Sequence, residues 1–225
     1  MTEADVAADL SEPDVRTGRS RLTWVLVGVL VVAVLVLAGT GGFLLGRSSG
    51  KDAVSASSVD AGFARDMSTH HQQAITMAIY ARANTDNPDV KLLAYEIEDT
   101  QQFEVGQMQG WLDTWGLSRQ SSIPLMAWMS GHGAVENGLM PGMATPSQMN
   151  ELKSAHGRAL DILFLQLMIR HHQGGIPMAR YAAAHAEKAY VRTLASTMAA
   201  EQAGEITRLE ALLRTLGGQP LAPAS

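Results

Sequence analysis

The chain has 225 residues, a formal net charge of −5 and hydrophobic residues at 46% of its positions. It contains no cysteine, which excludes disulfides and thiolate metal sites. The acidic balance, with no Lys/Arg cluster beyond the flank of one apolar run, argues against nucleic-acid binding.

The N-terminal part predicts a membrane anchor. Residues 1–21 are polar and typical of a short disordered tail, whereas residues 22–46 carry no charge and suffice for one transmembrane helix, with Trp24 near an interface. The alternative is a cleaved signal peptide. The apolar core of a signal peptide has only about 7–15 residues, fewer than the run at 22–46. Arg16, Arg19 and Arg21 precede the span, whereas only Arg47 and Lys51 follow it closely. This balance favours a cytoplasmic tail with an extracytoplasmic domain after the span.

An internal repeat organises the rest of the chain. Shifted by 101 residues, "FARDMSTHHQQAITMAIYA" (63–81) aligns with "FLQLMIRHHQGGIPMARYA" (164–182), and ten of the nineteen positions are identical. Apolar residues recur at helical spacing in both copies, and no segment alternates long enough to be a strand. We therefore expect an all-α protein, in which two duplicated helical hairpins form a four-helix bundle.

The bundle domain is expected over residues 59–217. It follows a flexible linker (47–58), contains a methionine-rich connector (117–149), and precedes a tail (218–225). Asn87 with Pro88 predicts a helix start, and Gly116 and Gly217 predict helix ends. Thr145 with Pro146 predicts a start that leads into the second histidine helix.

The repeated helices carry a candidate metal site. Residues three and four apart share a helix face, so each helix presents methionine, a histidine pair and a second methionine together. Thioethers select Cu(I), while imidazole also accepts zinc or iron. We therefore predict copper binding, with Cu(I) favoured over iron or zinc; the alternative is a methionine stripe that only fills the core. The predicted ligands are Met67, His70, His71, Met77, Met168, His171, His172 and Met178.

Glu104 and Glu205 also occupy equivalent positions of the repeat. They would orient the histidines through hydrogen bonds, act as ligands themselves, or remain solvated carboxylates. The connector adds further candidates, either as a flexible copper-capturing segment or as a flap that packs on the bundle, two compatible readings. These candidates are Met126, Met129, His132, Met140 and Met143.

The second copy departs from the first directly after its histidines. Gly174, Gly175 and Pro177 replace Gln73, Ala74 and Thr76, and an interior proline predicts a kink. The glycines would either open space beside the histidines, which makes the second pair the more accessible one, or admit the connector. Restoring the first copy's residues is expected to stabilise the fold.

The paired "M-x-x-HHQ" helices, the "MPGM" segment and the "FLQLMIRHHQG" run resemble domain-of-unknown-function family 305, over roughly residues 59–217. This resemblance implies a ferritin-like four-helix bundle and extracytoplasmic copper handling on the eight ligands named above. Together with the apolar run at 22–46, it favours a membrane-anchored, single-pass protein that buffers or delivers copper without catalysis. The alternatives are a metal-free helical interaction module and a ferritin-like metal-dependent oxidase.

Overall fold

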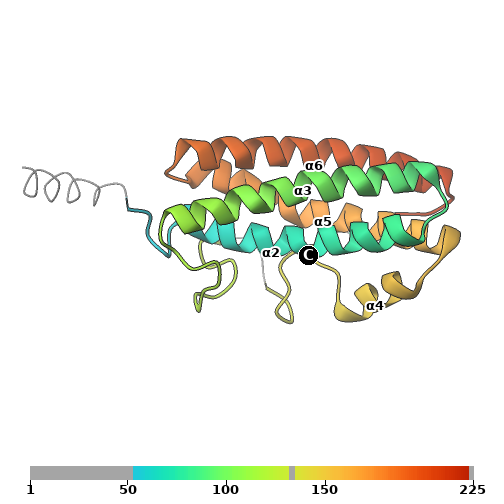
Figure 1. Ribbon diagram of the computed structural model, residues 1–225, viewed down its shortest axis with the longest axis horizontal. Helices are drawn as coiled ribbons and strands as arrows, with labels where there is room; N and C mark the ends of the chain where they lie inside the picture. Colours follow the sequence, from blue (N-terminus) through green and yellow to red (C-terminus); the bar gives the residue numbers. More distant parts are fainter. Residues whose placement is uncertain (1–52, 132–134, 223–225) are drawn as a thin grey trace, which may run out of the picture. The chain divides into compact units, whose positions relative to one another are not determined.

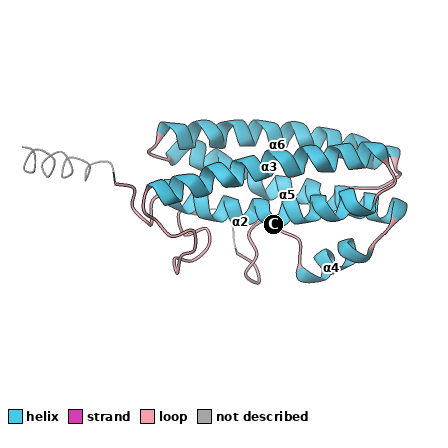
Figure 2. Ribbon diagram, in the orientation of Figure 1, coloured by secondary structure: helices cyan, strands magenta, loops and turns pink. Residues whose placement is uncertain are grey.

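The computed structural model describes residues 53–131 and 135–222, and within them it contains five α-helices and no strand. The predicted all-α class is therefore confirmed (Figure 2). With the labels of Figure 1, the helices are α2 (Val59–Asn84), α3 (Pro88–Thr114), α4 (Pro146–Ser154), α5 (Gly157–His185) and α6 (Ala189–Thr215).

The four long helices run side by side as a bundle, and the short α4 lies outside it (Figure 1). Helices α2 and α3 form one hairpin, α5 and α6 form the other, and the two hairpins meet where α2 packs on α5. The predicted membrane span at 22–46 lies outside the described residues. Within the described ranges, no helix is long and apolar enough to cross a membrane.

Most helix ends follow the sequence signals. The Asn87 side chain accepts hydrogen bonds from the first turn of α3, and Gly116 and Gly217 follow α3 and α6 with φ of 67° and 68°. Thr145 opens α4 with a capping box. The expected continuation into the second histidine helix is wrong, because α4 ends at Ser154 and α5 starts anew at Gly157, whose φ is +57°.

A polar layer divides the core of the bundle. Along each long helix, the buried apolar residues fall into two separate clusters, one toward each end of the bundle. Polar residues, all buried except the partly buried Glu205, occupy the level between the clusters, and each helix supplies two of them. They are His70 and His71 on α2, Gln101 and Glu104 on α3, His171 and His172 on α5, and Gln202 and Glu205 on α6.

Candidate metal centre

The two histidine pairs meet at the contact between α2 and α5. The rings of His70 and His171 lie 3.7 Å apart between centroids, at an interplanar angle of 33°. All four histidines are at most 1% exposed. The expectation that the second pair is more accessible is therefore wrong, because both pairs are enclosed by the bundle.

Backbone carbonyls fix the tautomers of His70 and His171. Nε2 of His70 lies 3.0 Å from the carbonyl oxygen of Pro141, and Nε2 of His171 lies 3.0 Å from the carbonyl oxygen of His70. Because a carbonyl oxygen only accepts, each Nε2 carries the hydrogen and donates it. In both neutral rings the lone pair is therefore on Nδ1.

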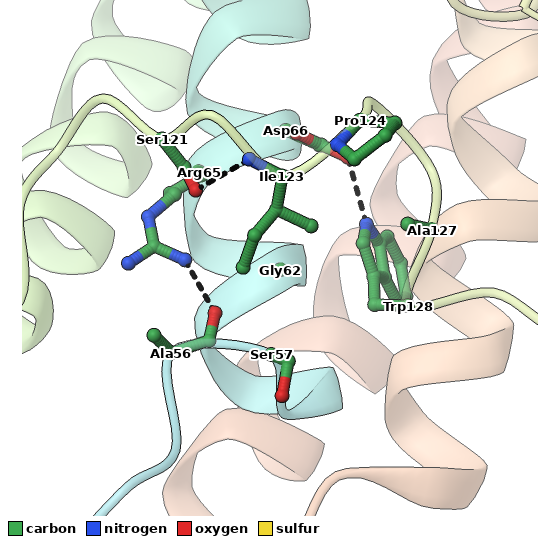
Figure 3. Close-up of a pocket in the computed structure, with 10 residues that line it drawn as sticks. All are labelled: Ala56, Ser57, Gly62, Arg65, Asp66, Ser121, Ile123, Pro124, Ala127 and Trp128. Carbon is green, nitrogen blue, oxygen red and sulfur yellow. Dashed lines mark hydrogen bonds between the residues drawn. The ribbon is translucent and has the colours of Figure 1, made fainter.

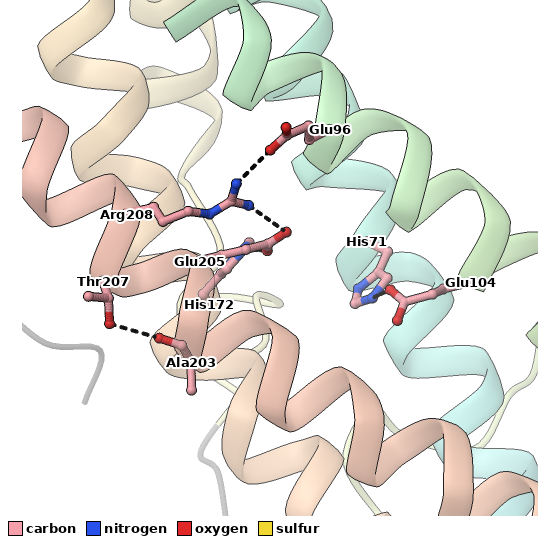
Figure 4. Close-up of polar contacts among 8 residues, drawn as sticks. All are labelled: His71, Glu96, Glu104, His172, Ala203, Glu205, Thr207 and Arg208. Carbon is pink, nitrogen blue, oxygen red and sulfur yellow. Dashed lines mark hydrogen bonds and ion pairs between the residues drawn. The ribbon is translucent and has the colours of Figure 1, made fainter. Parts of the chain in front are cut away.

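The other two histidines are held by carboxylates in the same way. Nε2 of His71 lies 2.9 Å from Oε2 of Glu104, and Nε2 of His172 lies 2.6 Å from Oε2 of Glu205 (Figure 4). In its ionised form, which for Glu104 is the form above a pKa of about 7, each carboxylate can only accept a hydrogen bond and so places the hydrogen on Nε2. Of the three roles considered for the glutamates, the orienting hydrogen bond is the one that this geometry provides.

The Nδ1 atoms of His70, His71 and His172 are buried and have no hydrogen-bond partner among the described residues. Both amide atoms of Gln101 and Oε1 of Gln202 in the same layer are also unpaired within the described ranges. Buried polar side-chain atoms are normally paired, so this group of atoms requires an explanation. An imidazole held at one nitrogen by a carboxylate or a carbonyl, with a lone pair at the other, is the usual arrangement of a metal-binding histidine. The donor chemistry therefore fits a metal ion.

The layer stabilises neutral side chains. Burial, and next the neighbouring His71, lowers the pKa of His70 from 6.5 to about 3; burial, and next His172, lowers the pKa of His71 to about 3. Burial also places the pKa of His171 well below 6.5. For Glu104, burial and then the charge of Glu205 raise the pKa from 4.5 to about 7.

The four predicted methionine ligands are fully buried on either side of this layer. Met67 of α2 and Met178 of α5 belong to one apolar cluster, and Met77 and Met168 belong to the other. Because α2 and α5 run antiparallel (Figure 1), each of the two clusters contains one of these methionines from each repeat. The metal candidates are thus grouped across the repeats and not within one helix.

The connector packs on the bundle, as the second of its two readings predicts. Met126, Met129 and Met140 are buried, and Met143 is partly buried against the same cluster. His132 lies outside the described residues.

The glycines of the second repeat admit the connector. A Cβ on Gly174 would collide with the backbone of Pro141, and a Cβ on Gly175 would lie 2.7 Å from Oε1 of Gln202. In the first repeat the equivalent residue, Gln73, binds the backbone of Ala144 through both ends of its amide, at 2.6 and 3.0 Å. Of the two functions considered for the glycines, room for the connector is the one observed.

The start of the connector is fixed by residues that the sequence analysis did not assign. Oδ2 of Asp66 accepts hydrogen bonds from the Met126 amide and the Trp128 indole, at 2.7 and 2.8 Å (Figure 3). Gly62 lies directly beneath Trp128, where a Cβ would collide with the indole. No local pattern signals these contacts, because they join residues about 60 positions apart.

Carboxylates and histidines alone do not complete a site. Within the described residues, no three side chains of histidine, aspartate or glutamate are grouped so that they would hold a metal ion. His156 is the exposed N-cap residue of α5 and lies apart from the polar layer. A metal centre here would therefore need the methionine sulfur atoms as well as the imidazoles.

Residues 60–213 match the family described as "Domain of unknown function (DUF305)". The structure resembles a DUF305 protein of Streptomyces coelicolor that is inferred to be secreted, with 42% identity and a TM-score of 0.70, over 75% of this chain and 99% of that one. It also resembles a DUF305 fragment from Deinococcus radiodurans, with 28% identity and a TM-score of 0.58, over 70% and 96% of the two chains.

The protein CopM in its Cu(II)-bound form has a similar fold. It shares 27% identity with this chain at a TM-score of 0.54, over 70% of this chain and 97% of that one. CopM is also known in Cu(I)-bound and silver-bound forms, and those structures, at 24% identity, support the shared fold alone. No curated protein matches the sequence.

Proposed function

Because this chain belongs to the DUF305 family, we propose that it is an extracytoplasmic copper-binding protein that buffers or delivers the metal. The relative CopM binds Cu(I), Cu(II) and silver, and Cu(I) is the form that thioether ligands select. The proposed cargo of this chain is therefore copper, with Cu(I) preferred.

One observation supports the proposal above the others. The histidines of the polar layer are held through Nε2, and three Nδ1 atoms remain buried without a partner in the described structure. A protein that only packed its core would gain by replacing such rings with apolar side chains, since an unpaired buried polar atom costs about 1–3 kcal/mol. Bound copper would accept such lone pairs, with methionine sulfur atoms completing its ligands, and would offset that cost.

The methionine pairs supply soft donors next to the imidazoles. In the proposed site, Met67 with Met178 and Met77 with Met168 provide thioethers on either side of the histidine layer. Glu104 and Glu205 then act as orienting residues, which hold His71 and His172 with Nδ1 free to bind. Similar carboxylate–histidine pairs raise the basicity of a ligand and strengthen metal binding.

We further propose that residues 22–46 anchor the domain to the membrane, with the bundle outside the cytoplasm. The support is the uncharged 25-residue run, which is long enough to span a bilayer, and the relative that is inferred to be secreted. The chain has no cysteine that could bind copper through a thiolate. Thioether and imidazole groups are therefore the donors through which it would bind copper outside the cytoplasm.

The test is a Cu(I) titration of the full chain against a competing chelator, under controlled redox conditions. Replacing both histidines in the variant His171→Ala/His172→Ala is expected to weaken binding at least tenfold. The matched control, His156→Ala, removes an exposed histidine outside the layer and should bind as the wild type does. Equal Cu(I) affinity in the double variant and the control would refute the site.

A further inference from the structure

Three aromatic rings gather at one end of the bundle. Trp111 and Trp115 stack at 6.2 Å between centroids, and Tyr190 lies 5.2 and 6.4 Å from them. The Trp115 indole donates a hydrogen bond of 3.0 Å to the Tyr190 hydroxyl. Tyr190 is 45% exposed, and both indoles are partly exposed. We call Trp111, Trp115 and Tyr190 the aromatic end.

This end is also where the chain enters the bundle. Trp115 follows the last residue of α3 and Tyr190 is the second residue of α6. Asp60 at the start of α2 accepts hydrogen bonds from the amides of Glu187 and Lys188. The start of α2, the end of α3 and the start of α6 therefore lie together, as Figure 1 shows. The nearby connector adds two exposed apolar residues, Ile123 and Leu125.

The segment before α2 is fixed to the same end. Val54 packs against the apolar cluster that contains Met67, and Nη1 of Arg65 donates a 2.7 Å hydrogen bond to the carbonyl of Ala56 (Figure 3). Only residues 47–53 then separate the proposed membrane span from a fixed point of the bundle. Seven residues reach at most about 25 Å, so the aromatic end would be held close to the bilayer.

The chemistry of the aromatic end suits the lipid headgroup layer. Tryptophan and tyrosine combine an apolar ring with a polar tip, and both are enriched at membrane–water interfaces. The cationic side chain of Arg119 beside this end is paired with Asp113 at 2.6 Å, which offsets the charge that this pair presents to the headgroups.

We propose that the aromatic end, together with Ile123 and Leu125, docks in the headgroup layer of the membrane that anchors the chain. This inference depends on the membrane anchor proposed above and is independent of copper binding. Docking would point the end of the bundle that carries these rings at the bilayer, and the α2–α3 turn at the opposite end away from it.

The experiment uses the full chain in phosphatidylcholine/phosphatidylglycerol vesicles. Because the sequence has no cysteine, a single nitroxide label can be placed at Thr114→Cys beside the tryptophans, or at Asp86→Cys in the α2–α3 turn. Collision rates are measured with oxygen, which concentrates in lipid, and with a water-soluble nickel chelate. We expect the label at 114 to favour oxygen and the label at 86 to favour the chelate.

Two double variants distinguish docking through the aromatic end from nonspecific adsorption to the vesicles. Trp111→Ala/Trp115→Ala is expected to shift the label at 114 toward the chelate, whereas Tyr95→Ala/Phe103→Ala, which removes exposed rings elsewhere on α3, should not. The tryptophans also pack on the core, so the tryptophan variant could misfold. In that case the collision rates of the label at 114 in the chain with all rings intact test the docking.

Equal chelate access at 114 and 86 in chains that float with the vesicles would overturn the docking and leave the anchor in place. Chains that do not float would overturn the anchor and the docking together, while Cu(I) affinity would still report on the copper site. Dipolar broadening between labels at 114 without oxygen preference would show that a second copy covers this end, and would also refute the proposal.

Discussion

At the scale of single residues, the polar layer is specified by the partner of each imidazole. Carbonyls hold His70 and His171, and carboxylates hold His71 and His172. The repeat in the sequence predicted the glutamate partners, because Glu104 and Glu205 follow their histidines by the same 33 residues. It could not predict the carbonyl partners, since a backbone oxygen carries no signal in the residue type.

Neutral buried histidines make the metal-free protein sensitive to acid. The pKa values of His70, His71 and His171 are lower in the folded state than 6.5, so the unfolded chain binds more protons below that pH. Their contribution to stability is full above pH 6.5 and is lost as the pH falls below 6.5, by about 1 kcal/mol per pH unit for each residue.

Glu104 acts in the opposite direction. Its pKa is raised from 4.5 to about 7, so its contribution is full below pH 4.5 and is lost as the pH rises to 7. Three histidines outweigh one glutamate, and we expect the free energy of unfolding of the metal-free protein to fall between pH 7 and pH 5. Urea titrations at both pH values measure it, and greater stability at pH 5 would contradict the histidine shifts.

At the scale of helices, the sequence predicted the four long segments because their apolar spacing, caps and terminal glycines agree. Asn87, Gly116 and Gly217 end or begin helices where expected. The break between α4 and α5 was missed, since His156 offers no side-chain cap. The packing of the connector was also beyond local patterns, because Asp66 and Gln73 hold it through long-range contacts.

The packing of the connector reverses one expectation drawn from the sequence. Restoring first-copy residues in α5 was expected to stabilise the fold, but a side chain at Gly174 would strike the backbone of Pro141. We therefore expect Gly174→Ala to lower the free energy of unfolding by about 1–3 kcal/mol, as overpacking does, and to expose the connector to proteolysis.

A second helical glycine provides the control for that variant. Gly204 in α6 is exposed, and no described atom other than its own helix neighbours lies within 4 Å of a Cβ placed there. Gly204→Ala should raise stability by about 0.5–1 kcal/mol, through helix propensity alone. Denaturant unfolding measures the free energy of unfolding of both variants. Equal stabilisation by both alanines would mean that the connector moves away from position 174 without a loss of stability.

At the scale of the whole molecule, the repeat and the fold group the same methionines differently. By sequence, Met67 corresponds to Met168 and Met77 to Met178, with an offset of 101 residues. In space, Met67 shares a cluster with Met178, and Met77 shares the other with Met168. The antiparallel contact of α2 with α5 thus builds each level from both halves, and neither hairpin alone would hold a complete donor set.

This arrangement predicts which methionines act together in copper binding. Leucine conserves the volume of methionine and removes the sulfur, so a double-mutant cycle on Cu(I) affinity isolates the coupling between two donors. We expect Met67→Leu and Met178→Leu to be coupled by about 1 kcal/mol, as for residues that share a partner. The repeat-equivalent pair, Met67→Leu and Met168→Leu, should be additive, because the polar layer separates their clusters. Stronger coupling between the repeat equivalents would instead mean that copper binds within each hairpin, and that the level-by-level grouping seen in the core does not organise the site.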